Sequence, residues 1–171
     1  MRSVTTLPSP VGRLTLASDG ESLIGLWLEG QKYFGAGLSG TEAEADLPVF
    51  RAAEVWLRAY FARAPLPPLP PLAPQGSFFR QAVWQLLLEI PYGTVTTYGA
   101  LAQKLRDRGI SAAAQAVGGA VGHNPISILI PCHRVVGSDG SLTGYAGGVA
   151  KKQFLLELEG VDMAGLYVPT R

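Results

Sequence analysis

The first third of the chain alternates short apolar runs with turn residues, a pattern typical of β-strands. Residues 13–17 and 23–28 are the apolar runs, and Ser18-Asp19-Gly20 between them is a hairpin turn signal. From Asp46 the apolar positions recur with the spacing of one helix face instead. Asp46 is the expected cap, Pro48 suits the first turn, and the face comprises Val49, Ala53, Trp56, Leu57 and Tyr60.

Residues 64–76 interrupt this pattern with the sequence APLPPLPPLAPQG, which holds six of the 13 prolines. Such a stretch has few amide donors and favours an extended polyproline conformation. We interpret it as a stiff linker and not as an SH3-type ligand. It divides the chain into a first domain at residues 1–63, the linker, and a second domain at residues 77–171.

Beyond the linker, the apolar spacing predicts short helices in close succession. Ser77 caps the first helix, Pro91-Tyr92-Gly93 ends it, and the β-prone residues 94–97 follow. Residues 98–105 and 112–121 form two further helices, the second capped by Ser111, and the turn between them contains glycine. Two short helices joined by a tight turn predict a helix-turn-helix.

The end of the chain adds β-structure and a last helix. The apolar residues 126–130 predict a buried strand. Residues 135–136 and 142–143 flank a turn at residues 138–141 and predict a hairpin, and a final helix runs from about residue 149 to 159. A helix-turn-helix followed by a β-hairpin is the element order of a winged-helix module.

Composition excludes several classes of protein. The 171 residues are 47% hydrophobic with a formal net charge of +1, which is not the composition of a disordered chain. No apolar run approaches the ~20 residues of a membrane span, and the N-terminus lacks the apolar core of a secretory signal. A single cysteine excludes an intrachain disulfide framework and a multi-cysteine zinc site. We therefore expect a cytoplasmic protein without membrane association, metal or cofactor.

The second helix of the pair consists almost entirely of small residues, AAAQAVGGA at residues 112–120. Two adjacent glycines weaken a helix by ~1 kcal/mol each relative to alanine, so a separate structural or functional requirement must favour small side chains here. Close packing against a neighbouring element and close approach to an external surface both explain it. A major-groove recognition helix needs long polar side chains, and only Gln115 is long here. A small-faced helix suits the narrow minor groove instead.

The single cysteine lies in Pro131-Cys132-His133-Arg134. A lone cysteine beside an apolar strand is most often a small buried hydrophobe. Its polar neighbours favour a nucleophile, because basic groups lower the pKa of a thiol below its ordinary ~8.5. Neighbours in an extended chain point to opposite faces, so His133 is expected to reach the sulfur through a water or a bend, with a carboxylate fixing its tautomer.

These residues resemble the signature of the O6-alkylguanine-DNA alkyltransferases. The sequence PCHRV at residues 131–135 follows Asn124-Pro125 and the apolar ILI of residues 128–130. The resemblance extends over residues 77–161, through IPYG at 90–93, AVG at 116–118 and LLELEG at 155–160. It implies an α+β fold, with a ribonuclease H-like N-terminal domain followed by a winged helix-turn-helix domain.

The resemblance also implies an activity. The family transfers the alkyl group from O6 of guanine, and less readily from O4 of thymine, irreversibly to its own cysteine, so that each molecule acts once. Cys132 is then the acceptor, His133 the base that acts through a water, and Glu159 the carboxylate that orients His133. Asn124 ties the recognition helix to the active-site loop. Tyr145 lines the base pocket and donates a proton or hydrogen bond to the leaving guanine.

The implied partner is double-stranded DNA carrying O6-alkylguanine, bound through the minor groove by a monomer. Tyr98 meets the phosphate of the flipped nucleotide. The other expected DNA-binding residues are Ala114, Gln115, Ala116, Gly118, Gly119 and Arg134. The expected base pocket comprises Val135, Tyr145, Gly147 and Gly148, with the carbonyls of Cys132 and Val135 reading the guanine amino group.

One position departs from the family's pattern. Gln115 stands where the family commonly has an arginine that fills the gap left by the flipped base. Glutamine is shorter and uncharged, which affects the efficiency of flipping and not the chemistry at Cys132. Arg106 and Arg108 are the residues placed to compensate.

Two other functions fit part of the same pattern. A non-catalytic sensor would bind alkylated DNA and recruit repair factors, but such relatives replace the cysteine, and Cys132 is present. A Cys/His hydrolase with many turnovers would not need a helix-turn-helix, and the stoichiometry of the reaction separates it from a suicide mechanism. The sequence therefore predicts single-turnover alkyl transfer, with the sensor as the alternative.

Overall fold

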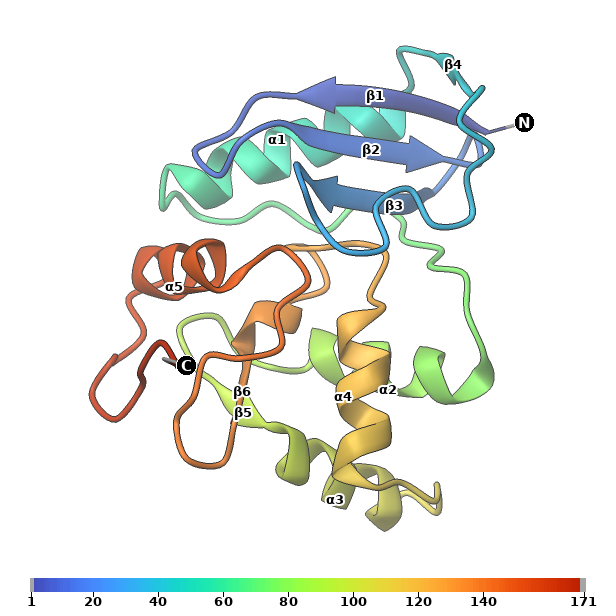
Figure 1. Cartoon of the computed structure of the whole chain (residues 1–171). Helices are drawn as coiled ribbons and strands as arrows, with labels where there is room; N and C mark the ends of the chain where they lie inside the picture. The colour runs from blue at the N-terminus through green and yellow to red at the C-terminus, as the bar shows by residue number, and fades with distance from the viewer. Residues whose placement is uncertain (1, 170–171) are drawn as a thin grey trace. The chain divides into compact units, whose positions relative to one another are not determined.

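The computed structural model describes residues 2–169, and the chain folds as two compact units. The first unit runs to Gln75 and also takes in Pro125–Leu129. The second comprises Gly76–Asn124 and the chain from Ile130 onward. In Figure 1 most of the first unit is coloured blue to green and its segment Pro125–Leu129 yellow to orange, whereas the second unit runs from green to red. The division between Gln75 and Gly76 falls at the end of the proline-rich segment.

The first unit is built on a four-stranded sheet in the order β3-β2-β1-β4. Strands β1 (Ser3–Leu7), β2 (Leu14–Ser18) and β3 (Leu23–Leu28) are antiparallel, and the short β4 (Ala43–Glu44) pairs with β1 in parallel. The predicted hairpin of β2 and β3 is confirmed. All six residues of β3 are buried, so this strand contributes to packing on both of its faces.

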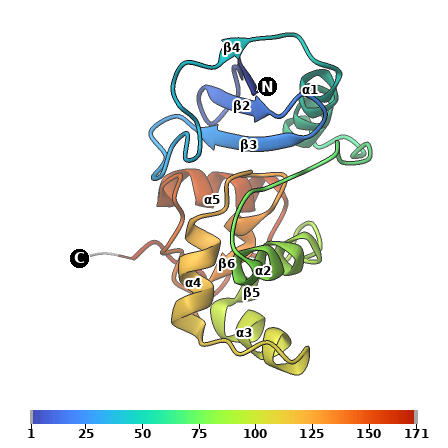
Figure 2. The ribbon, with the colours of Figure 1, turned by 90° about the vertical axis from the view of Figure 1, so that its right-hand side faces the viewer.

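Helix α1 (Pro48–Phe61) crosses one face of this sheet (Figures 1 and 2). Its predicted apolar face is confirmed, since all five of its residues are buried. The predicted cap is wrong: Leu47 occupies the N-cap position and no side chain caps the helix. Asp46 lies one residue too early, and its carboxylate instead accepts two hydrogen bonds of 2.8 Å from Arg51.

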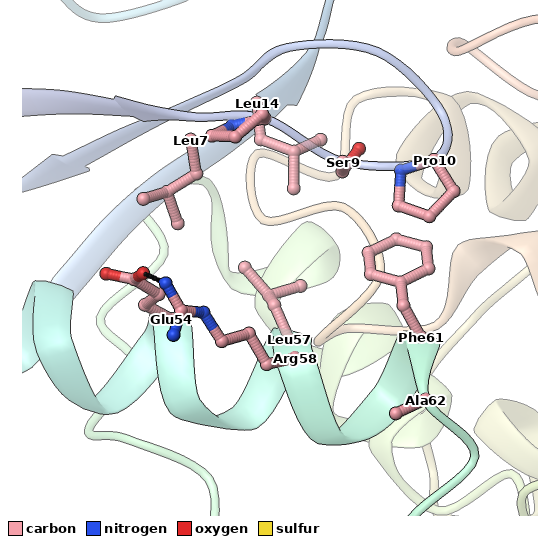
Figure 3. Close-up of a pocket in the computed structure, with 10 residues that line it drawn as sticks. Leu7, Ser9, Pro10, Leu14, Glu54, Leu57, Arg58, Phe61 and Ala62 are labelled. Atoms are coloured by element: carbon pink, nitrogen blue, oxygen red, sulfur yellow. Dashed lines mark hydrogen bonds and ion pairs between the residues drawn. The ribbon is translucent and has the colours of Figure 1, made fainter.

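Between α1 and the β1–β2 connection lies an open, mostly apolar pocket of about 360 Å³ (Figure 3). The two charged side chains that line it, Glu54 and Arg58, pair with each other. None of the residues predicted for the functional site lines this pocket.

The proline-rich segment is more than the stiff linker that we expected. The amide of Leu23 donates to the carbonyl of Pro71, and the amide of Ala73 donates to the carbonyl of Leu23, both at 2.8 Å. Ala73 also packs against the buried cluster of Ala17, Ile24 and Trp27. Because β3 is an edge strand, the second half of the segment covers backbone groups that would otherwise lack partners.

A second segment joins the same strand from far along the chain. The carbonyl of Pro125 accepts from the amide of Leu26 at 2.8 Å, and the amide of Ser127 donates to the carbonyl of Leu26 at 3.0 Å. The hydroxyl of Ser127 donates to Gln31 Oε1 at 3.0 Å, in a buried position. This segment, Pro125–Leu129, lies shortly before Cys132 in the sequence, and its backbone pairs with β3.

The second unit is mainly helical. It contains α2 (Phe78–Leu88), α3 (Tyr98–Asp107), α4 (Ala114–Gly122) and α5 (Val149–Leu158). As predicted, the hydroxyl of Ser77 caps α2, where it accepts from the amide of Arg80. Helix α4 packs against both α2 and α3, which confirms the predicted helix-turn-helix. Figure 2 shows these helices from the side.

Three predictions of local structure are wrong. Residues 126–130 are buried but form successive turns, with Ile128 at φ 71°. The strand β6 (Val135–Val136) forms no hairpin with residues 142–143 and pairs in parallel with β5 (Thr96–Thr97). Helix α4 starts after Ala113 without a side-chain cap, so Ser111 does not cap it. In the first two cases a partner distant in sequence, β3 or β5, decides the conformation.

No helix within residues 2–169 has the length and apolar character needed to cross a membrane.

Candidate active site

Cys132 begins a short 3-10 helix, Cys132–Arg134, directly after Pro131. It is 5% exposed, and its amide donates to the carbonyl of Ile130 at 2.8 Å. The side-chain amide of Asn124 donates to that same carbonyl at 2.8 Å. Asn124 follows the end of α4, so this carbonyl connects the end of α4 to the turn that carries the cysteine.

Burial raises the pKa of the Cys132 thiol. A hydrogen bond from the Asn124 side chain and the positive charge of Lys152 act in the opposite direction, but they do not outweigh the loss of water. The expectation of a lowered thiol pKa is therefore wrong for the free protein. The thiol is protonated until a base removes its proton.

The imidazole of His133 lies behind the cysteine turn with Nε2 2.6 Å from Oε2 of Glu159, and neither side chain is exposed. Burial lowers the pKa of His133, and the attraction of Glu159 does not fully compensate. The ring is therefore neutral near pH 7. A carboxylate only accepts hydrogen bonds, so Nε2 carries the proton and Nδ1 is the basic nitrogen.

Arg134 does not face solvent as the DNA-binding prediction required. It is 7% exposed, its Nε and Nη2 donate to the two oxygens of Glu159 at 2.8 and 3.1 Å, and Nη1 donates to the carbonyl of Ile90 at 2.7 Å. Burial raises the pKa of Glu159, but the hydrogen bonds from His133 and Arg134, together with the charge of Arg134, hold that pKa at about 2. Arg134 thus keeps the carboxylate ionised beside His133.

Lys152 is a buried cation that the sequence analysis missed. Its ammonium group donates to the carbonyls of Val135 and Thr143, and burial lowers its pKa to about 8. The helical spacing of α5 could have identified it, because Lys152 lies on the same buried face as Leu155 and Leu156. An apolar residue is expected at such a position. Its place beside the cysteine turn connects β6 to the loop that follows.

Two tyrosines flank the cysteine turn. Tyr145 is buried, and its ring meets that of His133 edge-on with centroids 6.4 Å apart. Tyr98 begins α3, and its hydroxyl donates to the carbonyl of Thr143 at 3.3 Å. Burial is the main reason that the pKa of Tyr98 is raised to about 12, so Tyr98 remains a hydrogen-bond donor.

Comparison with known proteins assigns this site to a family. Residues 78–161 match the 6-O-methylguanine DNA methyltransferase DNA-binding domain, and residues 3–71 match the ribonuclease-like domain of the same proteins. The chain belongs to the 6-O-methylguanine DNA methyltransferase family. The α+β fold, with a ribonuclease-like domain before a DNA-binding domain, is confirmed.

Relatives cover nearly the whole chain. The methylated-DNA–protein-cysteine methyltransferase of Haemophilus influenzae is 46% identical over 91% of this chain and 84% of its own length. The corresponding protein of Methanosarcina acetivorans is 44% identical over 89% of this chain and 94% of its own. A crystal structure of the Mycobacterium tuberculosis OGT in complex with DNA superposes with a TM-score of 0.81, at 44% identity over 92% of each chain.

In this methyltransferase, the exposed face of α4 comprises Ala114, Gln115, Ala116 and Gly119, and all of these except Gln115 are small. A Cβ atom on Gly119 would meet no atom of the described chain within 4 Å, and one on Gly118 would make only an ordinary contact with Tyr98. Internal packing therefore does not require either glycine, which favours approach to an external surface.

A groove of about 540 Å³ runs beside this face. The residues that line it are Tyr98, Gly99, Ala114, Gln115, Gly118, Ser138, Thr143 and Gly144. Gly144 has φ 86°, and a Cβ there would lie 2.6 Å from the Tyr98 hydroxyl. The structure thus brings Tyr98 and Gln115 to one groove.

Among the expected base-pocket residues, Val135 directly follows the cysteine turn and Tyr145 packs against His133. Val135 is fully buried, and Gly147 and Gly148 lead into α5, with Gly148 at φ 101° in its N-cap position. The carbonyl of Cys132 accepts from the amide of Val135, and that of Val135 accepts from Lys152. Each carbonyl has a second lone pair that can still accept a hydrogen bond from a base.

The two arginines expected to compensate for Gln115 are engaged elsewhere. Arg106 donates to the carbonyl of Ala112 at 2.7 Å and to Gln103 at 2.9 Å, and Arg108 donates twice to Glu89. The Arg106 guanidinium binds within the connection between α3 and α4, and the Arg108 guanidinium links this connection to the end of α2. Within residues 2–169 no group of three or more His, Cys, Asp or Glu side chains is placed to hold a metal ion.

Proposed function

We propose that this chain repairs DNA by a single direct transfer of the alkyl group from O6 of guanine to the sulfur of Cys132. The chain is a methylated-DNA–protein-cysteine methyltransferase by family and by its relatives along nearly its full length. The observation that supports the residue assignment is the only cysteine of the sequence. It is buried, it follows an Ile130 carbonyl that Asn124 binds, and it precedes His133, which is hydrogen-bonded to Glu159.

In the proposed reaction, His133 Nδ1 accepts the thiol proton of Cys132 through a water molecule. The ionised Glu159 stabilises the imidazolium that forms, because its carboxylate already binds Nε2. The sulfur attacks the alkyl carbon, the S–C bond forms, and the C–O6 bond breaks. The electron pair of the broken bond leaves with guanine. Tyr145 donates a hydrogen bond to the leaving base, and the proton lost by the thiol ends on guanine.

Burial of the thiol fits this sequence of events. Water exclusion keeps Cys132 protonated in the free protein, and the base acts only when a substrate fills the pocket. Asn124 and Lys152 partly offset the cost of forming a thiolate, because both favour the charged form. The product is a thioether, which is stable to water, so the cysteine is not regenerated.

We further propose that the protein acts as a cytoplasmic monomer on double-stranded DNA, with α4 in the minor groove. The small exposed face of α4 supports this geometry, because it admits close approach to the sugar-phosphate walls. A relative of 44% identity has been crystallised with DNA. In this arrangement Gln115 fills the space of the flipped base, and Tyr98 meets the phosphate of that nucleotide.

Stoichiometry tests the proposed function. A duplex with one O6-methylguanine is mixed with a limiting amount of protein, and repaired guanine is counted over time. We expect repair to stop at one guanine per protein molecule. Cys132→Ser should repair none and still bind the duplex, because the substitution leaves α3 and α4 unchanged. Continued turnover by a homogeneous sample contradicts the suicide mechanism.

A further inference from the structure

The chain after α5 returns to the loop that carries Tyr145. We call residues 162–169 the C-terminal tail and residues 137–145 the Tyr145 loop. The amide of Tyr167 donates to the carbonyl of Gly140, and the amide of Leu142 donates to the carbonyl of Tyr167, both at 3.0 Å. The hydroxyl of Tyr167 donates to Asp139 at 2.7 Å. Tyr167 of the tail therefore makes three hydrogen bonds to this loop, two as donor and one as acceptor.

The fit between tail and loop leaves no room for a side chain at their crossing. Gly140 has φ 90°, and a Cβ atom there would lie 1.9 Å from the carbonyl oxygen of Gly165. Beneath the crossing, Leu166 and Met163 of the tail pack against an apolar cluster that includes the buried Leu142. The apolar contacts stabilise the tail more than the phenol does, since the Tyr167–Asp139 bond is exposed to water.

The Tyr145 loop also lines the groove beside α4. Its Ser138, Thr143 and Gly144 line this groove together with Gln115. The carbonyl of Thr143 accepts from Tyr98 and from Lys152. Most of the loop has no regular secondary structure, so its place depends on these contacts and on those with the tail.

We propose that the C-terminal tail is a positioning element, which holds the Tyr145 loop as one wall of the groove and thereby sets the discrimination between small and bulky O6-alkyl groups. The proposal rests on the proposed function. A methyl group makes few contacts of its own, so its alignment with Cys132 depends on a fixed wall around the base. A benzyl group brings apolar surface and needs more room, so a loosened wall hinders it less.

The test compares transfer from O6-methylguanine and O6-benzylguanine, each in the same duplex, under single-turnover conditions. The Leu166→Ala/Tyr167→Ala double variant should lose about tenfold in the methyl rate constant, and the benzyl-to-methyl ratio should rise at least about threefold, since small misplacements of reacting groups cost large factors in rate. Tyr167→Phe keeps the backbone bonds and should restore a ratio close to that of the unchanged protein. Phe78→Ala, at a residue 78% exposed on α2, is the matched control.

The benzyl-to-methyl ratio of rate constants distinguishes a misplaced Tyr145 loop from a simple loss of stability. A partly unfolded sample transfers less in total, and the end point of the reaction counts its active molecules, but its ratio of rate constants stays unchanged. Gly140→Ala should shift the ratio in the same direction, and combining it with the double variant should add little, because both detach the same contact. An unchanged ratio in the double variant overturns the proposal. If the unchanged protein transfers no alkyl group, the proposed function fails instead.

Discussion

The hairpin of β2 and β3 and the segment from Asn124 to Val136 are both buried, but they are buried for different reasons. Side chains of the hairpin are almost all apolar, and its backbone groups pair within a regular ladder. The second segment buries Asn124, His133 and Arg134, and it bends through Ile128 at φ 71°, a conformation unfavourable for a β-branched residue. In the hairpin, burial of apolar side chains accompanies regular structure. In the second segment, polar side chains are buried around Cys132, the proposed acceptor.

The polar segment depends on partners that lie far along the chain. Glu159 accepts from His133 and twice from Arg134, at distances of 2.6 to 3.1 Å. A buried charge without a partner costs several kcal/mol, so the site is stable only while this set is complete. The hairpin has no such dependence, because loss of one apolar contact leaves its ladder intact.

The largest expected effect comes from breaking this set. Glu159→Gln removes the charge that faces His133 and Arg134, and it should lower the free energy of unfolding by about 3–5 kcal/mol and strongly slow alkyl transfer. Glu89→Gln is the matched control, since Glu89 pairs with Arg108 at the surface, and it should unfold as the unchanged protein does. Denaturant unfolding and single-turnover rates measure the two effects. Equal free energies of unfolding for the two variants would contradict a stabilising role of the buried residues Glu159, His133 and Arg134.

The same carboxylate predicts a dependence of stability on pH. The pKa of Glu159 is about 2 in the folded protein, below the ~4.3 of an unfolded glutamate. Its contribution is therefore complete above pH ~4.3 and is lost as the pH falls toward 2. Acid unfolding of the unchanged protein should show this loss, and Glu159→Gln should show a weaker dependence over the same range.

A smaller effect concerns the thiol itself. Because burial raises the pKa of Cys132, its rate of alkylation by iodoacetamide in the free protein should keep rising above pH ~8.5, where an ordinary thiol reaches half of its maximum. Asn124→Ala removes a group that favours the thiolate, so the midpoint should move to still higher pH. A midpoint below that of free cysteine would show that His133 and Glu159 activate the thiol before substrate binds.

The smallest expected effect is at Gln115. Gln115→Ala should slow repair of duplex DNA several-fold, because extruding a base costs a few kcal/mol that a filling side chain offsets in part. Repair of free O6-benzylguanine needs no extrusion and should change little. Gln115→Arg should speed duplex repair and steepen its dependence on salt, since one more cation faces the phosphates. Equal losses on both substrates in Gln115→Ala would place the residue in the fold or the pocket.

The comparison also explains which features the sequence predicts. Apolar periodicity locates β2, β3, the buried face of α1 and the helix pair, because those elements bury apolar surface that the spacing reveals. The run at residues 126–130 looks like a buried strand for the same reason, yet its backbone bonds to β3 and bends at Ile128. Burial is predictable there, and conformation is not.

A side-chain partner distant in sequence, or a helix that starts later than expected, accounts for the other differences. The family resemblance implies a DNA contact at Arg134, but Glu159, 25 residues later, binds this side chain in a buried position. Ser111 and Asp46 look like caps, but the helices start at positions that neither can reach. Cys132, His133 and Glu159 were predicted together only through the family resemblance, and their contact follows from packing of α5 against the cysteine turn.

The most direct measurement is the mass of the peptide that contains Cys132 after the protein has reacted with a duplex carrying O6-methylguanine. The account predicts that this peptide gains the mass of one CH₂ group, that fragmentation places the methyl on the sulfur of Cys132, and that the number of modified molecules equals the number of repaired guanines. Repaired DNA with an unmodified Cys132, or a methyl group on any other residue, would contradict it.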